Sequence, residues 1–282
     1  MILRIVLTAL FCCLLVGANC WPGMPPPTFV LAGQSNMVGS STMAPVIAVP
    51  SPEGRIAKTY THVDEWNLAN DPVHYSSGPG TTSAWPTFVG EWMAQVGRQV
   101  NVIATAWGGS CLLSTREGPD RVLGTEDDIP PRWDPHRTDA GTGSGSLYAW
   151  MLEQVAEANP MDLRAVLWYQ GECEVGYATT PTGVKYEDYK AGLKHLADHI
   201  WEDLGVPMVA APISLRPPPW PYQPARQPIH DAIIDAAAEH PHIYLGPNTD
   251  DLEHEDDGAH IHDVVTLGER WFDAVNLAGL AY

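Results

Sequence analysis

The chain has few basic residues for its length. Lysine and arginine together number 15 in 282 residues, against 34 aspartates and glutamates, and the formal net charge is −19. A protein that binds nucleic acid needs cations to neutralise phosphates. The composition therefore argues against a nucleic-acid partner, and an acidic surface of this kind mainly favours solubility.

The chain also lacks an apolar run long enough to cross a membrane. The longest, residues 5–16, is shorter than the ~20 residues that a transmembrane helix requires, so we expect no stable membrane insertion. Arg4 precedes this run and the small residues Val16-Gly17-Ala18 end it, which is typical of a signal peptide over residues 1–18. We predict a secreted or periplasmic protein, with a lipoprotein anchored through Cys20 as the alternative.

No internal repeat or break in composition divides residues 19–282, which we predict to form one domain. Five strand-like runs alternate with helix-length apolar patterns, and this alternation favours a parallel sheet with helices on both faces. We predict a flavodoxin-like three-layer α/β/α sandwich with a five-stranded parallel sheet. The strands are expected near residues 28–32, 100–106, 163–169, 207–213 and 242–246, and the helices near 85–99, 147–158, 186–204, 229–240 and 265–277, with long inserts at about 38–84, 110–145, 174–184 and 214–226.

The pentapeptide Gly33-Gln34-Ser35-Asn36-Met37 directly follows the first apolar run. Open α/β sheets bind their ligands at the carboxyl ends of the strands, so the hydroxyl of Ser35 is a candidate nucleophile there. The alternative is that Ser35 merely caps the next helix. Met37 replaces the second glycine of a Gly-x-Ser-x-Gly elbow, which argues against the α/β-hydrolase fold.

A nucleophilic serine needs a base and donors for the developing oxyanion. Near the C-terminus, Asp257 stands three residues before His260, a spacing that lets the carboxylate orient the imidazole. The second strand ends at Gly108-Gly109, where the backbone can offer N–H groups. The third strand ends at Gln170, which places a side-chain amide at the same edge.

These four segments, in this order, resemble the sequence blocks of the SGNH-type carbohydrate esterases. The most similar branch is the sialate O-acetylesterase and acetylxylan-esterase-like group, and the resemblance runs from Thr28 to the C-terminus. It implies a triad of Ser35, Asp257 and His260. It also implies an oxyanion hole formed by Ser35, by Gly108 or Gly109, and by Gln170.

The implied reaction is removal of O-acetyl or other short acyl groups from carbohydrates, without a cofactor. Two rival functions stay open. An SGNH lipase or thioesterase would need a broad apolar acyl channel, whereas the inserts are polar and acidic. A non-catalytic glycan-binding protein would bind sugar without ester turnover.

Neighbours of the predicted triad are interpreted as supports rather than reactants. We expect Gln34 and Asn36 to hold the serine loop. The carboxylate of Glu172 is expected to tie the Gln170 loop to neighbouring backbone N–H groups.

Cys20, Cys111 and Cys173 remain once a signal peptide is removed. Cys111 and Cys173 each follow a segment assigned to the oxyanion hole, so a disulfide between them is plausible in an oxidising compartment. Two unrelated buried thiols are the alternative, since the sequence supplies no distances.

Two segments contain residue types that can bind metal ions, the segment 254–262 and the acidic loop 118–128, and we predict a metal site at neither. His254, Glu255, His260 and His262 are suitable ligand types, but the chain has no His-Glu-x-x-His spacing and the triad already explains His260. The acidic loop 118–128 offers oxygens of the kind that calcium binds, without EF-hand spacing. The remaining histidines are expected to be surface or capping residues; they are His62, His74, His136, His195, His199, His230, His240 and His242.

Overall fold

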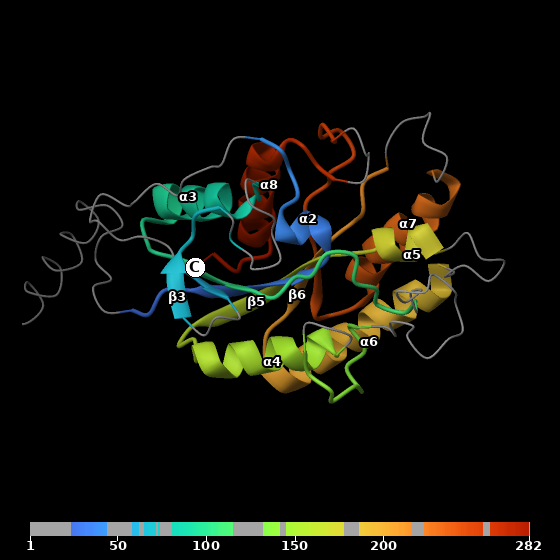
Figure 1. The fold of residues 1–282 in the computed structure, drawn as a ribbon, viewed down its shortest axis with the longest axis horizontal. Helices are drawn as coiled ribbons and strands as arrows, with labels where there is room; N and C mark the ends of the chain where they lie inside the picture. Colours follow the sequence, from blue (N-terminus) through green and yellow to red (C-terminus); the bar gives the residue numbers. More distant parts are fainter. Residues whose placement is uncertain are drawn as a thin grey trace, which may run out of the picture.

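The computed structural model describes residues 24–43, 58–61, 65–71, 73, 81–114, 132–141, 145–177, 186–215, 223–255 and 260–281. Within them, one seven-stranded sheet separates two layers of helices (Figure 1). The strands are β1 (Thr28–Gly33), β2 (Lys58–Thr61), β3 (Glu65–Leu68), β4 (Asn101–Ala104), β5 (Leu163–Tyr169), β6 (Met208–Ala211) and β7 (Ile243–Leu245). The three-layer α/β/α prediction is confirmed.

The strand order is β3-β2-β4-β1-β5-β6-β7, and every neighbouring pair is parallel except β2 with β3. The five predicted strands are β1 and β4 to β7, and their order is the flavodoxin-like one. The predicted number of strands was wrong, because β2 and β3 extend one edge of the sheet from within the insert at 38–84. Both are four residues long, and β3 is mostly exposed, so neither carries the apolar run that marks a buried strand.

Seven helices are described, and five of them match predicted ones. They are α3 (Trp85–Val96), α4 (Leu147–Ala158), α6 (Tyr186–Leu204), α7 (Gln223–Glu239) and α8 (Val264–Leu277). Helix α3 ends before the predicted residue because Gly97 adopts the left-handed conformation that closes a helix (φ +69°). Two short helices, α2 (Ser35–Val38) and α5 (Glu172–Tyr177), were not predicted.

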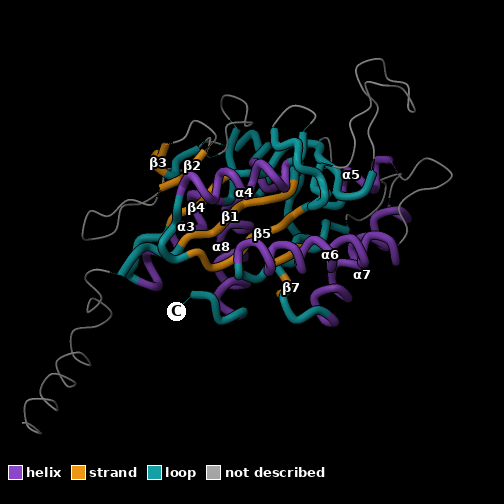
Figure 2. Tube along the Cα trace, turned by 90° about the horizontal axis from the view of Figure 1, so that it is seen from below, coloured by secondary structure: helices purple, strands orange, loops and turns teal. Residues whose placement is uncertain are grey.

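Each face of the sheet is covered by its own hydrophobic core. Successive side chains of a strand point to opposite faces, and all six residues of β1 are buried. Phe29 and Leu31 pack with α3 and α8, whereas Val30 and Ala32 pack with α4, α6 and α7. Figure 2 shows α4 and α6 on the side from which the molecule is viewed there.

The ends of β1 and β5 are pressed together at Gly33, which pairs with Tyr169. A Cβ at Gly33 would lie 2.3 Å from the Tyr169 carbonyl oxygen, and the residue has φ +123°. Only glycine fits there. The contact brings the predicted serine loop beside the loop that follows β5.

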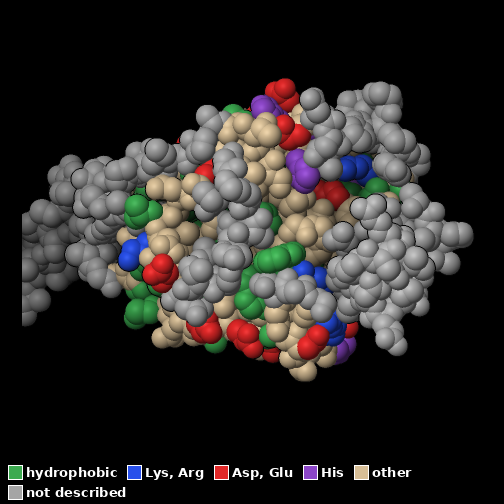
Figure 3. Space-filling model, viewed as in Figure 1, with side chains coloured by type: hydrophobic (Ala, Val, Ile, Leu, Met, Phe, Trp, Pro, Cys, Tyr) green, Lys and Arg blue, Asp and Glu red, His purple; other side chains and the backbone are tan. Residues whose placement is uncertain are grey.

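Several predictions fall outside the described residues, among them the signal peptide at 1–18, Cys20 and the acidic loop 118–128. In the described part of the chain, no helix has the length and apolar character that crossing a membrane requires. Where Figure 3 shows side chains, the acidic ones are scattered over that face rather than gathered in one patch.

Candidate active site

Ser35 is the first residue of α2 and directly follows the loop that leaves β1. The N-cap position of this helix is occupied by Gln34, so Ser35 does not take the capping place that the alternative interpretation gave it. The residue is partly exposed, whereas Asn36 and Met37 behind it are buried. A serine hydroxyl at this strand end is therefore open to a ligand.

The side chain of Asn36 joins three segments that are far apart in the sequence. Its Nδ2 donates to Glu172 Oε1 at 2.7 Å, and its Oδ1 accepts from the backbone N–H of Ile261 at 3.0 Å. The serine helix is thus held to the loop after β5 and to the C-terminal segment. Ser35 precedes Asn36 in the chain and His260 precedes Ile261, so these hydrogen bonds bring the segments of Ser35 and His260 together.

His260 lies in a short antiparallel contact that precedes α8. The Glu255 backbone N–H donates to the His260 carbonyl at 2.8 Å, and His254 pairs with Ile261 across an isolated bridge. His260 is partly buried, and it lies near enough to Glu172 to be one of the smaller influences that oppose the rise in the pKa of that carboxyl caused by burial. Asp257, the third member of the predicted triad, lies outside the described residues.

The loop of Gly108 is anchored to the end of β1. The Trp107 backbone N–H and the Ser110 hydroxyl both donate to the Gly33 carbonyl, at 3.0 and 3.1 Å. The indole N–H of Trp133 in turn donates to Ser110 Oγ at 2.8 Å. Gly108 is exposed, with open space where a Cβ would project. A backbone donor at Gly108 can therefore be approached by a ligand.

Gln170 directly follows β5, as predicted. It is fully buried, at 0 % exposure. Its Nε2 donates to the Ser110 carbonyl at 3.2 Å and contacts Glu174 Oε1 at 3.4 Å, while its Oε1 accepts from the Tyr189 hydroxyl at 2.9 Å. The Nε2 atom thus contacts two protein acceptors, and through Ser110 and Tyr189 the Gln170 side chain links the loop after β4 to α6.

Glu174 is a residue of this site that sequence reasoning missed. It is fully buried, and its Oε1 accepts from the backbone N–H groups of Leu112 and Leu113 at 2.6 and 3.0 Å. The carboxylate therefore holds the loop that follows Gly108 against α5. Its partners lie some sixty positions earlier in the chain, so no local pattern indicated this role.

Glu172 accepts a hydrogen bond from the Asn36 side chain at 2.7 Å, and a backbone hydrogen bond also acts on its carboxyl. Although the residue is partly exposed, its Oε2 is buried without a hydrogen-bond partner among the described residues. Burial raises the pKa of the Glu172 carboxyl. The nearby charge of Arg226 is the largest of the effects that oppose this rise, and it offsets the rise only in part.

Cys111 and Cys173 form a disulfide in the structure, with their Cα atoms 5.3 Å apart and a separation of 62 positions in the sequence. The backbone N–H of Cys173 also donates to Gln34 Oε1 at 3.1 Å. The disulfide thus joins the Gly108 loop to α5, and Gln34 joins α5 to the serine loop. Glu174 lies close to both sulfur atoms, but sulfurs in a disulfide are not thiolate ligands for a metal.

Glu255 and His262 are an ion pair, with 3.0 Å between Oε1 and Nδ1. The Thr42 backbone N–H also donates to Glu255 Oε1, at 2.7 Å. The Glu255 hydrogen bond raises the pKa of His262. Burial opposes ionisation of Glu255, but hydrogen bonds from Thr42 and His262 outweigh it and lower the pKa of that carboxyl. The pair therefore links the segment after α2 to the segment of His260.

A groove of about 540 Å³ lies elsewhere, between β7 and α8, and is lined by residues such as Tyr244, Leu245, Arg270 and Leu277. No residue of the predicted site lines it. The serine site is accordingly defined by the loops at the strand ends and not by this groove.

The fold, with a serine at the end of β1, is that of the SGNH-type hydrolases. A family model described as carbohydrate esterase, sialic acid-specific acetylesterase, matches residues 26–276. The chain therefore belongs to this carbohydrate esterase family and is a carboxylic ester hydrolase. Among curated proteins, none matches the sequence.

Solved structures share the fold at low sequence identity. A protein from Arabidopsis thaliana is 17 % identical, with a TM-score of 0.62 over 91 % of this chain and 100 % of its own. NanS is 13 % identical, with a TM-score of 0.60 over 90 % and 98 %. A carbohydrate acetylesterase from Xanthomonas citri is 16 % identical, with a TM-score of 0.57 over 91 % of this chain and 56 % of its own.

Proposed function

We propose that this chain removes acetyl or other short acyl groups from carbohydrates with Ser35 as nucleophile, His260 as base and Asp257 as the carboxylate that orients the base. The observation that carries the proposal is the pair of hydrogen bonds made by Asn36, which hold the serine helix against the segment of His260. Membership of the carbohydrate esterase family supports the same reaction.

In the proposed reaction, the Oγ of Ser35 attacks the acyl carbonyl while His260 takes its proton. Asp257 stays ionised and stabilises the imidazolium. Backbone N–H groups of Ser35 and Gly108 donate to the tetrahedral oxyanion. His260 then protonates the leaving sugar hydroxyl, and water attacks the acyl-enzyme in a second cycle that frees the acid and restores the serine.

Gly108 is proposed as the loop donor in preference to Gly109 because it is exposed and has open space beside its Cα. Gln170 has a positioning role in this scheme, since its amide contacts the carbonyl of Ser110, two residues further along the same loop. The buried Glu174 and the disulfide hold this loop from the other side.

The same proposal includes export. Residues 1–18 have the charged start, apolar run and small-residue end of a signal peptide. An exported enzyme would meet extracellular or periplasmic glycans, and a disulfide persists in such compartments.

The test is acetate release by the purified protein from a panel of acetylated polysaccharides and acetylated sialosides, with long-chain esters assayed beside them. We expect turnover of acetylated sugars and little of long-chain esters. Preference for long-chain esters would favour a lipase instead. Glycan binding that survives in Ser35→Ala, with no turnover by the unmodified chain on any ester, would favour a binding protein.

A further inference from the structure

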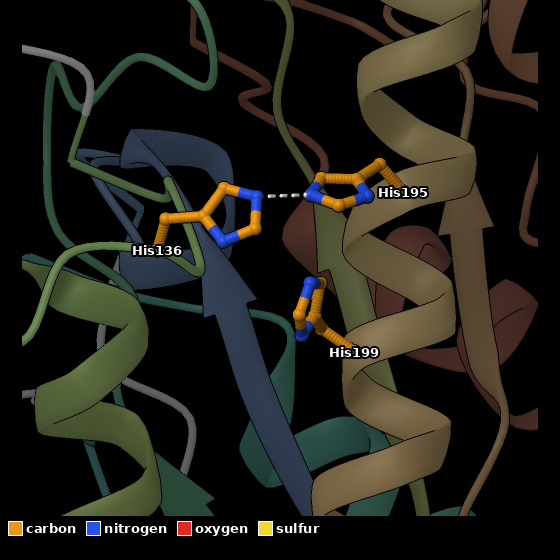
Figure 4. A group of neighbouring side chains, drawn as sticks. All are labelled: His136, His195 and His199. Atoms are coloured by element: carbon orange, nitrogen blue, oxygen red, sulfur yellow. Dashed lines mark hydrogen bonds between the residues drawn. The ribbon is translucent and has the colours of Figure 1, made fainter.

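Three histidine side chains gather on the sheet face covered by α4, α6 and α7. His195 and His199 lie one turn apart on α6, and His136 lies in a turn of the segment 132–141. Figure 4 shows the rings of His136 and His195 facing each other, with His199 below the gap between them. None of the three belongs to the site around Ser35.

The spacing of their ring nitrogens suits a single metal ion. One ring nitrogen from each histidine lies within 4.8 Å of the other two, and the Nε2 atoms of His136 and His195 are 3.0 Å apart. A tetrahedral zinc ion with Zn–N bonds of ~2.0–2.1 Å separates its nitrogen ligands by about 3.3 Å. Small side-chain rotations would therefore bring all three rings onto one ion.

The elements that carry the three rings are held in place without the ion. His195 and His199 are four residues apart on a 19-residue helix, so they share one face of it. The turn of His136 is fixed by Asp134, whose carboxylate and carbonyl accept from the backbone N–H groups of His136 and Arg137 at 3.0 and 3.2 Å. His136 and His195 are exposed and His199 is partly exposed, so an ion can enter from solvent.

We propose that His136, His195 and His199 bind a divalent transition-metal ion, zinc above all, which clamps the segment 132–141 to α6. Neutral imidazole is a preferred ligand for such ions, and the fourth position would be taken by water. Calcium and magnesium prefer oxygen ligands, and no carboxylate belongs to this group. The sequence prediction had treated these histidines as surface or capping residues.

A metal ion bound by the three histidines would also stabilise buried residues of the segment 132–141. The clamped segment also carries Trp133, which is fully buried and donates to Ser110 Oγ at 2.8 Å. Zinc that binds only the folded chain raises its stability by mass action. The expected readout is therefore thermal stability, independent of ester turnover.

The experiment uses tag-free protein that has been stripped with a chelator and exchanged into clean buffer. Zinc chloride is titrated by calorimetry, and melting curves are recorded with zinc, with magnesium and with neither. His136→Gln and His199→Gln are compared with His242→Gln, a matched histidine outside the cluster that stacks on Trp201.

We expect one zinc per chain, a melting temperature raised by about 5 °C at a hundredfold excess over Kd, and no shift with magnesium. His136→Gln and His199→Gln should each weaken zinc binding at least about tenfold, and His242→Gln should bind like the unmodified chain. The exposed His136 makes that variant informative even if His199→Gln folds poorly. Absence of zinc binding, or equal affinity in His136→Gln and the unmodified chain, would overturn the proposal.

Discussion

At the residue scale, the site depends on polar side chains whose hydrogen bonds join its loops, as well as on the proposed reactive groups. Asn36 uses its amide nitrogen for Glu172 and its amide oxygen for the backbone of Ile261. Gln34 accepts from Cys173, and Gln170 links Ser110 to Tyr189. Buried amides used in this way fix loops to one another, because leaving a buried partner unpaired costs about 1–3 kcal/mol.

Gln170→Met separates a positioning role from a donor role. The substitution keeps the length of the side chain but removes both amide groups, leaving the Ser110 carbonyl without its buried donor. We expect the free energy of unfolding to fall by about 1–3 kcal/mol, together with a loss of turnover. Denaturant melts and kcat measured on the same samples check this.

If Gln170 were instead a direct donor to the oxyanion, Gln170→Met would give a different pattern. Removal of one such donor typically costs about 10²–10³ in kcat without a matching loss of stability. That pattern in Gln170→Met would contradict the positioning role and restore the direct role that the sequence suggested.

Glu172→Gln tests the buried carboxyl through pH. Because burial raises its folded pKa above the ordinary 4.5, the group contributes stability that is fully present below the unfolded pKa and is lost as pH rises through the folded pKa. Glutamine keeps an oxygen for Asn36 and does not titrate. The melting temperature of the unmodified chain should therefore fall, relative to Glu172→Gln, as pH rises from about 4 towards neutrality.

The control for this series is Glu153→Gln on the exposed side of α4. Subtracting its pH series accounts for the loss of one surface carboxyl. A constant remaining difference for Glu172→Gln would contradict the raised pKa of Glu172.

At the element scale, the disulfide and Glu174 both hold the loop after β4 against α5. Closing a loop of 62 residues stabilises a chain by about 4 kcal/mol in the chain-entropy model. We expect reduction to lower the melting temperature. Protein produced without residues 1–18, titrated unfolded and unreduced, should show one free thiol, that of Cys20. Three free thiols on titration would contradict the disulfide.

The elements that were predictable from the sequence are those with a local signal. β1, β4, β5 and β6 carry buried apolar runs, and β7 is a short apolar run of which only Ile243 is buried. The bounds of α4 and α6 agree with their apolar spacing. β2 and β3 have no such run. They form strands because β2 pairs with β4 and β3 pairs with β2, which a local sequence pattern does not show. Helices α2 and α5 are too short to show a helical period.

The same limit applies to the candidate site. The segments that carry Ser35, Gly108 and His260 could be predicted because each has its own short motif. The burial of Gln170 and the role of Glu174 could not, since both depend on partners about sixty residues away. The histidine cluster joins a turn to a helix, with His136 and His195 separated by 59 positions. No local sequence pattern indicates that these two residues meet.

At the scale of the whole molecule, the parallel sheet brings the functional segments together. Parallel strands present their carboxyl ends at one edge, so loops that follow β1, β4 and β5 meet there although they are far apart in sequence. The disulfide and the amide hydrogen bonds then fix the meeting point. The family membership shows an ester hydrolase, and this convergence supports the proposed use of Ser35 as its nucleophile.

The central claim is tested most directly by steady-state acetate release from an acetylated carbohydrate by four variants. Ser35→Ala and His260→Ala should each lose at least about 10⁴-fold in kcat while melting near the temperature of the unmodified chain. His254→Ala and His262→Ala, from the same segment as His260, should stay within about tenfold of the unmodified chain. Near-normal turnover by Ser35→Ala, or an essential His262 beside a dispensable His260, would contradict the account.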